Sequence, residues 1–357
     1  MVASFPAIYF IAITTKDLAR VLISVKISST SLVTGAAGFI GSHVVDELLS
    51  RDHAVVALDD LSGGFADNVN PKARFVQGSI LDQALVARLF AETRFDYVFH
   101  LAAYAAEGLS HFIRRFNYEN NLLGSVGLIN AAVNHEVKCF VFTSSIAVYG
   151  RNQLPMTEET APLPEDPYGI AKFAVEQDLR AARELFGLNS IVFRPHNVYG
   201  ERQNIGDRYR NVVGIFMNNI LQGRPLPVFG DGQQSRAFSY IGDVAPLIAR
   251  SVEVPGACNQ TFNVGADQPY TVNQLARAVC AAMGADAALQ HLPARNEVKH
   301  AYASHDKVAG IFQYRPQFSL EAGLARMVAW VKKTGARQSR KFGALDIAKN
   351  LPPSWRE

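Results

Sequence analysis

Two side chains suited to proton transfer, Tyr168 and Lys172, stand four residues apart in the sequence. That spacing places both on one face of a helix, and Asp166 and Pro167 before them are typical of the first positions of a helix. A tyrosine that acts as a base must lose a proton whose ordinary pKa is about 10, and lowering that pKa to near 7 takes about 4 kcal/mol. Neighbouring positive charges supply such energy. The pair therefore predicts a base for an alcohol; the simpler alternative is a surface Tyr/Lys pair.

A serine pair, Ser144 and Ser145, follows a predicted buried strand over residues 139–143. Ligands of open α/β sheets bind at the carboxyl ends of the strands. In that position the Ser145 hydroxyl can share a substrate's reacting oxygen with Tyr168, whereas serines at strand ends otherwise serve as caps or turns. Ser145, Tyr168 and Lys172 are therefore our candidate catalytic residues.

A glycine pattern with the spacing GxxGxxG, formed by Gly35, Gly38 and Gly41, follows an apolar run and precedes a helical pattern. Gly35 permits a tight turn, Gly38 lets a pyrophosphate approach the backbone, and Gly41 allows close helix packing. The N-terminus of the helix offers free N–H groups and a positive dipole end to the anion. The pattern predicts a dinucleotide site; taken alone, it also fits an ordinary strand-to-helix turn.

An aspartate at the end of the next predicted strand, Asp59, strengthens the case for a dinucleotide. A carboxylate there accepts hydrogen bonds from ribose hydroxyls. Asp60 adds a second negative charge and no arginine follows at once, so a 2′-phosphate would be repelled. The sequence therefore predicts NAD rather than NADP, and no metal. A positively charged nicotinamide ring would join the Lys172 ammonium in favouring the Tyr168 phenolate.

These residues lie in an alternation of short apolar runs and longer helical patterns. The runs are nearly continuous in apolar residues, as expected of parallel strands that helices cover on both faces. The pattern predicts an α/β fold with a Rossmann-like, doubly wound parallel sheet. Strands are expected over 31–34, 54–58, 74–76, 97–101, 139–143, 191–193 and 261–264, and helices over 42–51, 120–134 and 168–186.

The regular alternation stops after residue 195, where polar and Gly/Pro-rich stretches begin. An apolar run near the N-terminus is too short for a membrane span and lacks the basic start of a secretory signal. The expected units are an appendage of unknown role (1–27), an NAD-binding domain (28–195 plus about 237–265), a smaller, discontinuous C-terminal substrate lobe (196–236 plus about 266–335) and a basic, peripheral tail (336–357).

The composition excludes several classes of protein. With 357 residues, 48% of them apolar and 19% charged, the chain is not a disordered one. Its 35 basic and 32 acidic residues give a net charge of +3, too balanced to predict a nucleic-acid binder. Cys139, Cys258 and Cys280 lie far apart, which indicates neither a disulfide framework nor a zinc site. We expect a cytoplasmic protein.

The motifs occur together in an order that resembles a known family. The glycine loop, Asp59, segments 100–103 and 144–150 and the Tyr168/Lys172 pair resemble the extended short-chain dehydrogenase/reductase family, and in it the NAD-dependent epimerases and dehydratases. The likeness runs from about residue 28 to 335 and is strongest to nucleotide-sugar epimerases of the UDP-glucose 4-epimerase type. It implies that NAD is held by Gly35, Gly38, Phe39, Ile40, Gly41, Asp59, Ser79, Ile80, Leu101, Ala102, Ala103, Asn121, Ser144, Tyr168 and Lys172.

The same likeness implies where a sugar nucleotide would bind. Asn197, Arg236 and Arg295 match positions that contact its diphosphate, and a planar guanidinium can hold phosphate oxygens in a fork. Asn211 and Phe229 are expected near the base, and Ser145 at the sugar.

Three residues depart from the resembled pattern. Ala105 stands where the best-known epimerases carry a lysine near the diphosphate, and Ser79 replaces an aspartate beside the adenine. Ala301 is small at a place where a bulky side chain would narrow the sugar pocket, which suggests room for an N-acetyl group.

The resemblance implies an isomerase that oxidises C4 of a UDP-sugar transiently, through a 4-keto intermediate, and a homodimer formed by helices near 120–133 and 168–186. A dehydratase or decarboxylase of the same family is the alternative. Dehydratases carry an Asp-Glu pair directly after the catalytic hydroxyl, whereas Ile146 and Ala147 stand here and cannot transfer protons. A non-catalytic NAD-sensing protein is a third alternative; such proteins typically lose the tyrosine or the lysine.

Overall fold

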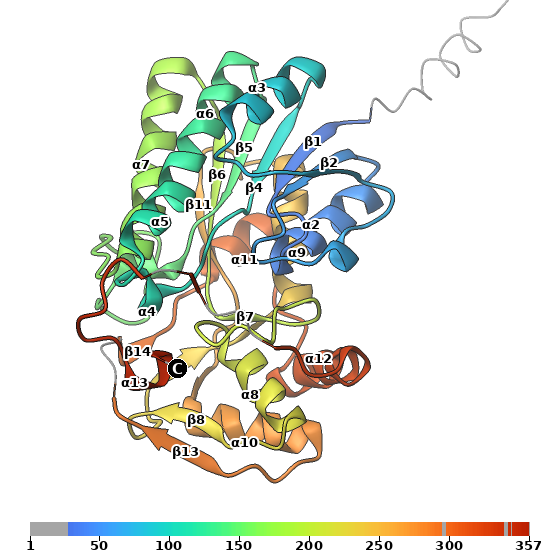
Figure 1. The fold of residues 1–357 in the computed structure, drawn as a ribbon. Coiled ribbons are helices and arrows are strands. Elements are labelled where there is room, and N and C mark those ends of the chain that lie inside the picture. The colour runs from blue at the N-terminus through green and yellow to red at the C-terminus, as the bar shows by residue number, and fades with distance from the viewer. Residues whose placement is uncertain (1–27, 295–297, 339–341, 344, 357) are drawn as a thin grey trace, which may run out of the picture.

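The fold is built on a parallel sheet of seven strands in the order β11-β6-β5-β4-β1-β2-β3 (Figure 1). The computed structural model describes residues 28–294, 298–338, 342–343 and 345–356. The chain runs outward from β1 to one edge and then resumes beside β1 at β4, which makes the β1/β4 junction a topological switch point. The strands are β1 (Thr30–Thr34), β2 (Ala54–Asp59), β3 (Arg74–Gln77), β4 (Tyr97–His100), β5 (Cys139–Thr143), β6 (Ser190–Pro195) and β11 (Thr261–Val264).

Helices cover both faces of this sheet. Successive side chains along each strand point to opposite sides, and because both sets are largely apolar, each face needs its own layer of helices. In β1, Leu32 joins the core beneath α3, α6 and α7, while Val33 joins the core beneath α2 and α9. Both residues are fully buried. The predicted doubly wound α/β fold is therefore confirmed. The helices and single turns of this domain are α2 (Phe39–Ser50), η1 (Ala66–Asn68), α3 (Gln83–Glu92), α4 (Glu107–Ser110), α5 (Arg114–Tyr118), the π-helical turn η2 (Glu119–Leu123), α6 (Gly124–Asn134), η3 (Ile146–Tyr149), α7 (Pro167–Phe186), α9 (Ile241–Arg250), η4 (Ser251–Glu253) and α11 (Asp306–Phe312).

A smaller lobe lies beyond the carboxyl ends of the strands, in the lower half of Figure 1. It combines helices with three small sheets, in which β8 pairs with β13, β9 lies between β12 and β14, and β7 pairs with β10. Its elements are β7 (Val198–Tyr199), α8 (Val212–Leu221), β8 (Leu226–Phe229), β9 (Ser235–Ala237), β10 (Ser239–Tyr240), β12 (Pro269–Thr271), α10 (Val272–Met283), β13 (Leu289–Leu292), β14 (His300–Ala301) and α12 (Leu320–Thr334).

The C-terminal segment is not the peripheral tail that the sequence led us to expect. Leu351 and Trp355 are buried in an apolar cluster with Leu109 and Ile113 of the larger domain. Trp355 lies in the last described helix, α13 (Pro353–Arg356). The segment contains apolar side chains between its basic ones. Burying Leu351 and Trp355 stabilises the packed position of the segment, while the basic side chains around them can stay in solvent.

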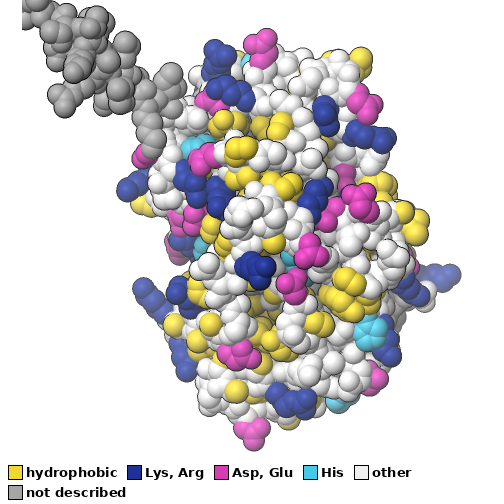
Figure 2. All heavy atoms as spheres, turned by 180° about the vertical axis from the view of Figure 1, so that it is seen from behind, with side chains coloured by type: hydrophobic (Ala, Val, Ile, Leu, Met, Phe, Trp, Pro, Cys, Tyr) yellow, Lys and Arg dark blue, Asp and Glu magenta, His cyan; other side chains and the backbone are white. Residues whose placement is uncertain are grey.

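The face of the molecule seen from behind is mixed in charge (Figure 2). Figure 2 shows Lys and Arg interspersed with Asp and Glu over the face seen from behind. Among the described residues, helices that combine the length and the apolarity needed to cross a bilayer do not occur. The predicted appendage over residues 1–27 lies outside the described residues.

Candidate active site

A cavity of about 1500 Å³ lies where the two lobes meet. The strands beneath it end level with one another: Thr34 pairs with Leu58 and His100, and His100 pairs with Phe142. The residues that follow these four positions therefore form one row at the carboxyl edge of the sheet. That row carries the glycine turn, Asp59 and the serine pair, so the sheet gathers at one edge motifs that are far apart in sequence.

The glycine turn fits a dinucleotide diphosphate. Gly35 has φ +70°, and a Cβ there would lie 2.7 Å from the Ala102 nitrogen. A Cβ on Gly41 would lie 2.0 Å from the Gly35 oxygen. Gly38 caps α2 without a side-chain hydrogen bond, so the first N–H groups of the helix are open to an anion. The backbone is thus packed as tightly as a phosphate cradle requires.

Asp59 is held in position beside this turn. One carboxylate oxygen accepts a hydrogen bond from the Ala37 N–H at 3.0 Å and the other from the Leu61 N–H at 2.7 Å. Burial, the largest cause, raises the pKa of Asp59. Each carboxylate oxygen has further acceptor capacity, so the side chain can also bind ribose hydroxyls, as predicted.

The three candidate catalytic residues meet in the same cavity. Ser145 hydrogen-bonds the Tyr168 phenol, and its hydroxyl oxygen also accepts from the Ala147 N–H at 3.1 Å. Lys172 donates from Nζ to the Thr143 carbonyl at 2.7 Å. Its ammonium lies 5.9 Å from the centre of the Tyr168 ring. The arrangement offers a phenol and a hydroxyl to one substrate oxygen, with an amine beside them.

The electrostatics of this group differ from the sequence-based expectation. Burial raises the pKa of Tyr168, and the Ser145 hydrogen bond only partly opposes it. Burial also lowers the pKa of Lys172 to about 7. Loss of water destabilises the phenolate and the ammonium alike, so Lys172 does not make the tyrosine acidic in the protein alone. Further positive charge is needed before Tyr168 can act as a base.

A buried ion pair that the sequence reading missed supports the serines and the lysine. Glu176, one turn beyond Lys172 on α7, accepts hydrogen bonds from Ser144 Oγ at 2.5 Å and from Arg194 Nε at 3.0 Å. Arg194 also donates to the Tyr149 hydroxyl at 2.7 Å. Glu176 opposes the effect of burial on the Lys172 pKa. The sequence did hold one indication of this role: Glu176 lies four residues after Lys172 and therefore on the same buried face of α7.

The residues expected at the substrate also lie in the cavity. Asn197 has φ +42° and donates from Nδ2 to the Ala237 carbonyl at 3.2 Å. Arg236, on the neighbouring strand β9, donates to the Lys299 carbonyl at 3.0 Å. Asn211 and Phe229 line the same space. Arg295 lies outside the described residues.

Two buried histidines, His196 and His305, lie behind Asn197 and connect to the exposed Asp267 carboxylate. His196 Nδ1 donates to the Ala237 carbonyl at 3.2 Å, and its Nε2 lies 2.8 Å from His305 Nε2. His305 Nδ1 lies 2.5 Å from an Asp267 carboxylate oxygen. Burial lowers the pKa of His196 to about 3. Because the neutral His196 ring donates from Nδ1 to a carbonyl, its Nε2 accepts the hydrogen bond from His305 Nε2. These hydrogen-bonded side chains hold the segment that carries Asn197 in position.

Two predicted positions lie elsewhere than expected. Asn121 does not line the cavity; its Oδ1 accepts from the Tyr104 N–H at 2.8 Å and its Nδ2 donates to the Tyr104 carbonyl at 3.1 Å. It therefore positions Tyr104, which does line the cavity. Ala301 packs in an apolar cluster with Ile146 and Met156, so its small size does not enlarge the cavity.

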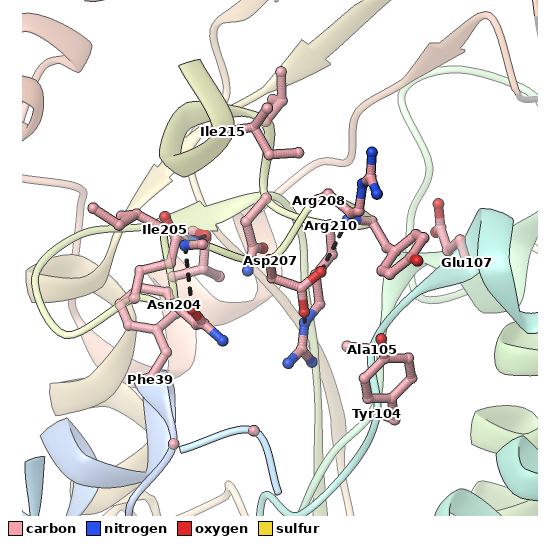
Figure 3. Close-up of a pocket in the computed structure, with 18 of the residues that line it drawn as sticks. Phe39, Tyr104, Ala105, Glu107, Asn204, Ile205, Asp207, Arg208, Arg210 and Ile215 are labelled. Carbon is pink, nitrogen blue, oxygen red and sulfur yellow. Dashed lines mark hydrogen bonds and ion pairs between the residues drawn. The ribbon is translucent and has the colours of Figure 1, made fainter. Parts of the chain in front are cut away.

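The other predicted contacts all line the cavity. The cofactor side carries Gly35, Gly38, Phe39, Ile40, Gly41, Asp59, Ser79, Ile80, Leu101, Ala102, Ala103, Ser144, Tyr168 and Lys172. The lining also includes residues that the sequence reading missed, on the loop before α8 and in the C-terminal segment: Asp207, Arg208, Arg210, Arg337 and Trp355. Figure 3 shows Asp207 and Arg210 in this region, with Phe39 on one side and Tyr104 and Ala105 on the other. Clusters of three or more metal-binding side chains are absent from the described part of the chain.

Comparison with known proteins agrees with this geometry. The family model of the NAD dependent epimerase/dehydratase family matches residues 31–265. The UDP-glucose 4-epimerase of Mycolicibacterium smegmatis is 36% identical over 310 residues, covering 85% of this chain and 98% of the relative.

Two solved structures share the fold over most of this chain. The UDP-glucose 4-epimerase of Thermotoga maritima with UDP-glucose matches with a TM-score of 0.81 at 36% identity, covering 85% of this chain and 99% of that one. The UDP-glucose 4-epimerase of Thermus thermophilus in complex with NAD matches with a TM-score of 0.80 at 32% identity, with the same coverage. The chain belongs to the NAD-dependent epimerase/dehydratase family, and its cofactor is NAD.

Proposed function

We propose that the chain is a nucleotide-sugar 4-epimerase that interconverts UDP-glucose and UDP-galactose. One observation carries this proposal: Tyr168, Ser145 and Lys172 share a cavity with Asn197 and Arg236 of the second lobe. A sugar diphosphate held by the second lobe thus places its sugar ring beside the phenol. The names of the relatives support a UDP-sugar.

The chain's own residues then have distinct roles. Tyr168 accepts the proton of the sugar 4-hydroxyl, and Ser145 hydrogen-bonds the same oxygen. When bound, NAD supplies reversible hydride transfer at C4. Lys172 binds the ribose next to the nicotinamide and lies beside Tyr168. Asn197 and Arg236 retain the diphosphate while the 4-keto sugar turns over, so that Tyr168 returns its proton to an oxygen on the opposite face of the ring.

The apolar residues after Ser145 favour epimerisation over dehydration. Ile146 and Ala147 are both buried, at 7% and 8% exposure, and neither can transfer the protons that elimination at C5 and C6 requires. A dehydratase or decarboxylase therefore remains only the alternative.

A substrate assay tests the proposal. Purified protein is incubated with UDP-galactose and, separately, with UDP-N-acetylgalactosamine, and the products are followed by proton NMR. We expect UDP-glucose from the first; the second measures whether a C2 N-acetyl group is accepted. Absence of an epimer from both, in protein shown to contain NAD, would refute the proposal, and a 4-keto-6-deoxy product would establish the dehydratase instead.

We also propose a homodimer and a cytoplasmic location. The packed unit of η2, α6 and α7 exposes large apolar side chains: Leu123 at 57%, Ile170 at 40%, Leu185 at 75% and Phe186 at 62%. Such residues gather at interfaces between subunits. Light scattering of the purified protein should give the mass of two chains, and Leu185→Glu with Phe186→Glu should give one.

A further inference from the structure

Arg210 reaches from the second lobe onto the cofactor side of the cavity. It lies on the loop between β7 and α8, yet its guanidinium carbon is 4.7 Å from the centre of the Tyr104 ring. A Cβ on Gly63 would lie 3.2 Å from Arg210 Nη2. The Arg210 side chain is 15% exposed. It is therefore a largely enclosed cation between two loops of the NAD domain (Figure 3).

The topology shows what lies between those two loops. Gly63 follows β2, and Tyr104 follows β4. These strands are the two neighbours of β1, and β1 leads directly into the glycine turn. A side chain that touches both flanking loops lies across the carboxyl end of β1. Arg210 and the N-terminus of α2 thus both lie at the end of β1 that leads into the glycine turn.

An ion pair holds Arg210 in this position and leaves its terminal nitrogens available. Asp207 binds Arg210 Nε at 2.7 Å and also accepts from the Tyr209 N–H at 2.9 Å. The Asp207 side chain is 9% exposed. Within the described residues, neither terminal nitrogen of Arg210 has a hydrogen-bond partner. Such a fork matches the geometry of phosphate oxygens.

The charges on the NAD domain favour such a cation. A diphosphate brings negative charge to a site already flanked by Asp59 and Asp60. Lys172 is held at the far end, against the Thr143 carbonyl, and Ala105 next to Tyr104 carries no charge. We propose that Arg210 binds the diphosphate of NAD, so that the second lobe supplies part of the cofactor site. Release of NAD then requires the loop before α8 to move.

The first experiment measures NAD binding directly. In Arg210→Met, which keeps the aliphatic stem over Tyr104, we expect the Kd for NAD of the stripped protein to rise roughly 10- to 100-fold, the range for loss of a charge-assisted hydrogen bond. NAD retained per chain through purification should fall in parallel. Adding Ala105→Lys to this variant places a cation beside the same loop and should restore most of the affinity. The Kd for UDP, measured by the same titration, should change less than about threefold.

A second experiment needs no variant and so does not depend on folding. Phenylglyoxal modifies arginines, and mass spectrometry locates the modified residue. NAD should protect Arg210 in the wild-type protein, and UDP alone should not. Equal modification with and without NAD would overturn the proposal, as would an NAD affinity within twofold of wild type in Arg210→Met. Loss of UDP binding with unchanged NAD binding would assign Arg210 to the substrate's diphosphate instead. Neither readout uses turnover, so failure of the proposed epimerase activity leaves the result interpretable.

Discussion

The two sides of the cavity are built in different ways. Apart from Arg210, the cofactor side comes from one stretch of chain whose strands end level in a single sheet, and Gly35 and Gly41 leave no room for a Cβ. The substrate side is assembled from separated segments, joined by hydrogen bonds such as those of the His196–His305–Asp267 chain. From this contrast we expect a rigid binding site for the cofactor and a more adjustable binding site for the sugar. Substitutions on the two sides should therefore fail differently.

The largest expected effect is on chemistry alone. Tyr168→Phe removes the proton acceptor but keeps the buried ring, so kcat should fall on the order of 10³-fold, within the range for general acid–base groups. NAD content and the melting temperature should stay close to wild type. Tyr118→Phe, which lies outside the cavity lining, is the matched control and should keep full activity. A Tyr168→Phe protein with more than a tenth of wild-type kcat would remove this residue from the chemistry.

On the cofactor side, a substitution that shifts the backbone should reduce stability and NAD binding most. Gly41→Ala places a Cβ 2.0 Å from the Gly35 oxygen, so the turn must shift; we expect a loss of about 2–4 kcal/mol in unfolding free energy together with loss of bound NAD. In contrast, Gly310→Ala in α11 meets no atom within 4 Å and should be neutral or slightly stabilising. Urea unfolding and NAD content of the two variants check this. Retention of NAD by Gly41→Ala would show that the turn is not tightly packed.

Acid should weaken both sides through buried, neutral histidines. Burial lowers the pKa of His100, under the cofactor, and of His196, behind Asn197, to about 3. The unfolded chain binds these protons near pH 6.5, so it carries more protons than the folded one between pH 3 and 6.5, and stability falls as the pH drops through that window. From pH 7 to 5 each histidine should cost about 2 kcal/mol. Urea titrations at both pH values measure the loss, and His100→Asn should reduce it by about 2 kcal/mol; an unchanged pH dependence in that variant would contradict the assignment.

The smallest effect is expected on the substrate side. His305→Gln shortens the chain of contacts behind Asn197, so KM for the UDP-sugar should rise about three- to tenfold, the cost of roughly one hydrogen bond. The value of kcat and the NAD content should change less than twofold, because neither depends on Asn197. Steady-state kinetics separate these parameters, and a fall in kcat without a rise in KM would place His305 nearer the chemistry than proposed.

The residues predicted for the cofactor side lie together in the cavity because their motifs are local. The glycine spacing, Asp59 and the Tyr168/Lys172 pair each depend on a short stretch, and the parallel sheet brings those stretches to one edge. Asn121 is the exception; its amide is taken up by the Tyr104 backbone. Side-chain burial also reversed the expected acidity of Tyr168, an effect that spacing alone does not reveal.

The loop before α8 and the C-terminal segment were less predictable because their contacts join distant residues. Arg210 acts through Tyr104 and Gly63, more than a hundred positions away in the sequence. The C-terminal segment reads as a basic tail until Trp355 is seen against Tyr209 and Phe112. No pattern within a short stretch of sequence predicts the contacts of Arg210 or those of Trp355.

The fate of the hydrogen on C4 tests the central claim most directly. UDP-galactose carrying deuterium at C4 is converted in ordinary water, and the UDP-glucose formed is analysed by NMR. If the oxidant stays bound and Tyr168 handles only the hydroxyl proton, deuterium should remain at C4 and no solvent hydrogen should enter the ring. Loss of deuterium to solvent, or solvent hydrogen at C5 or C6, would contradict transient oxidation at C4 in a closed cavity.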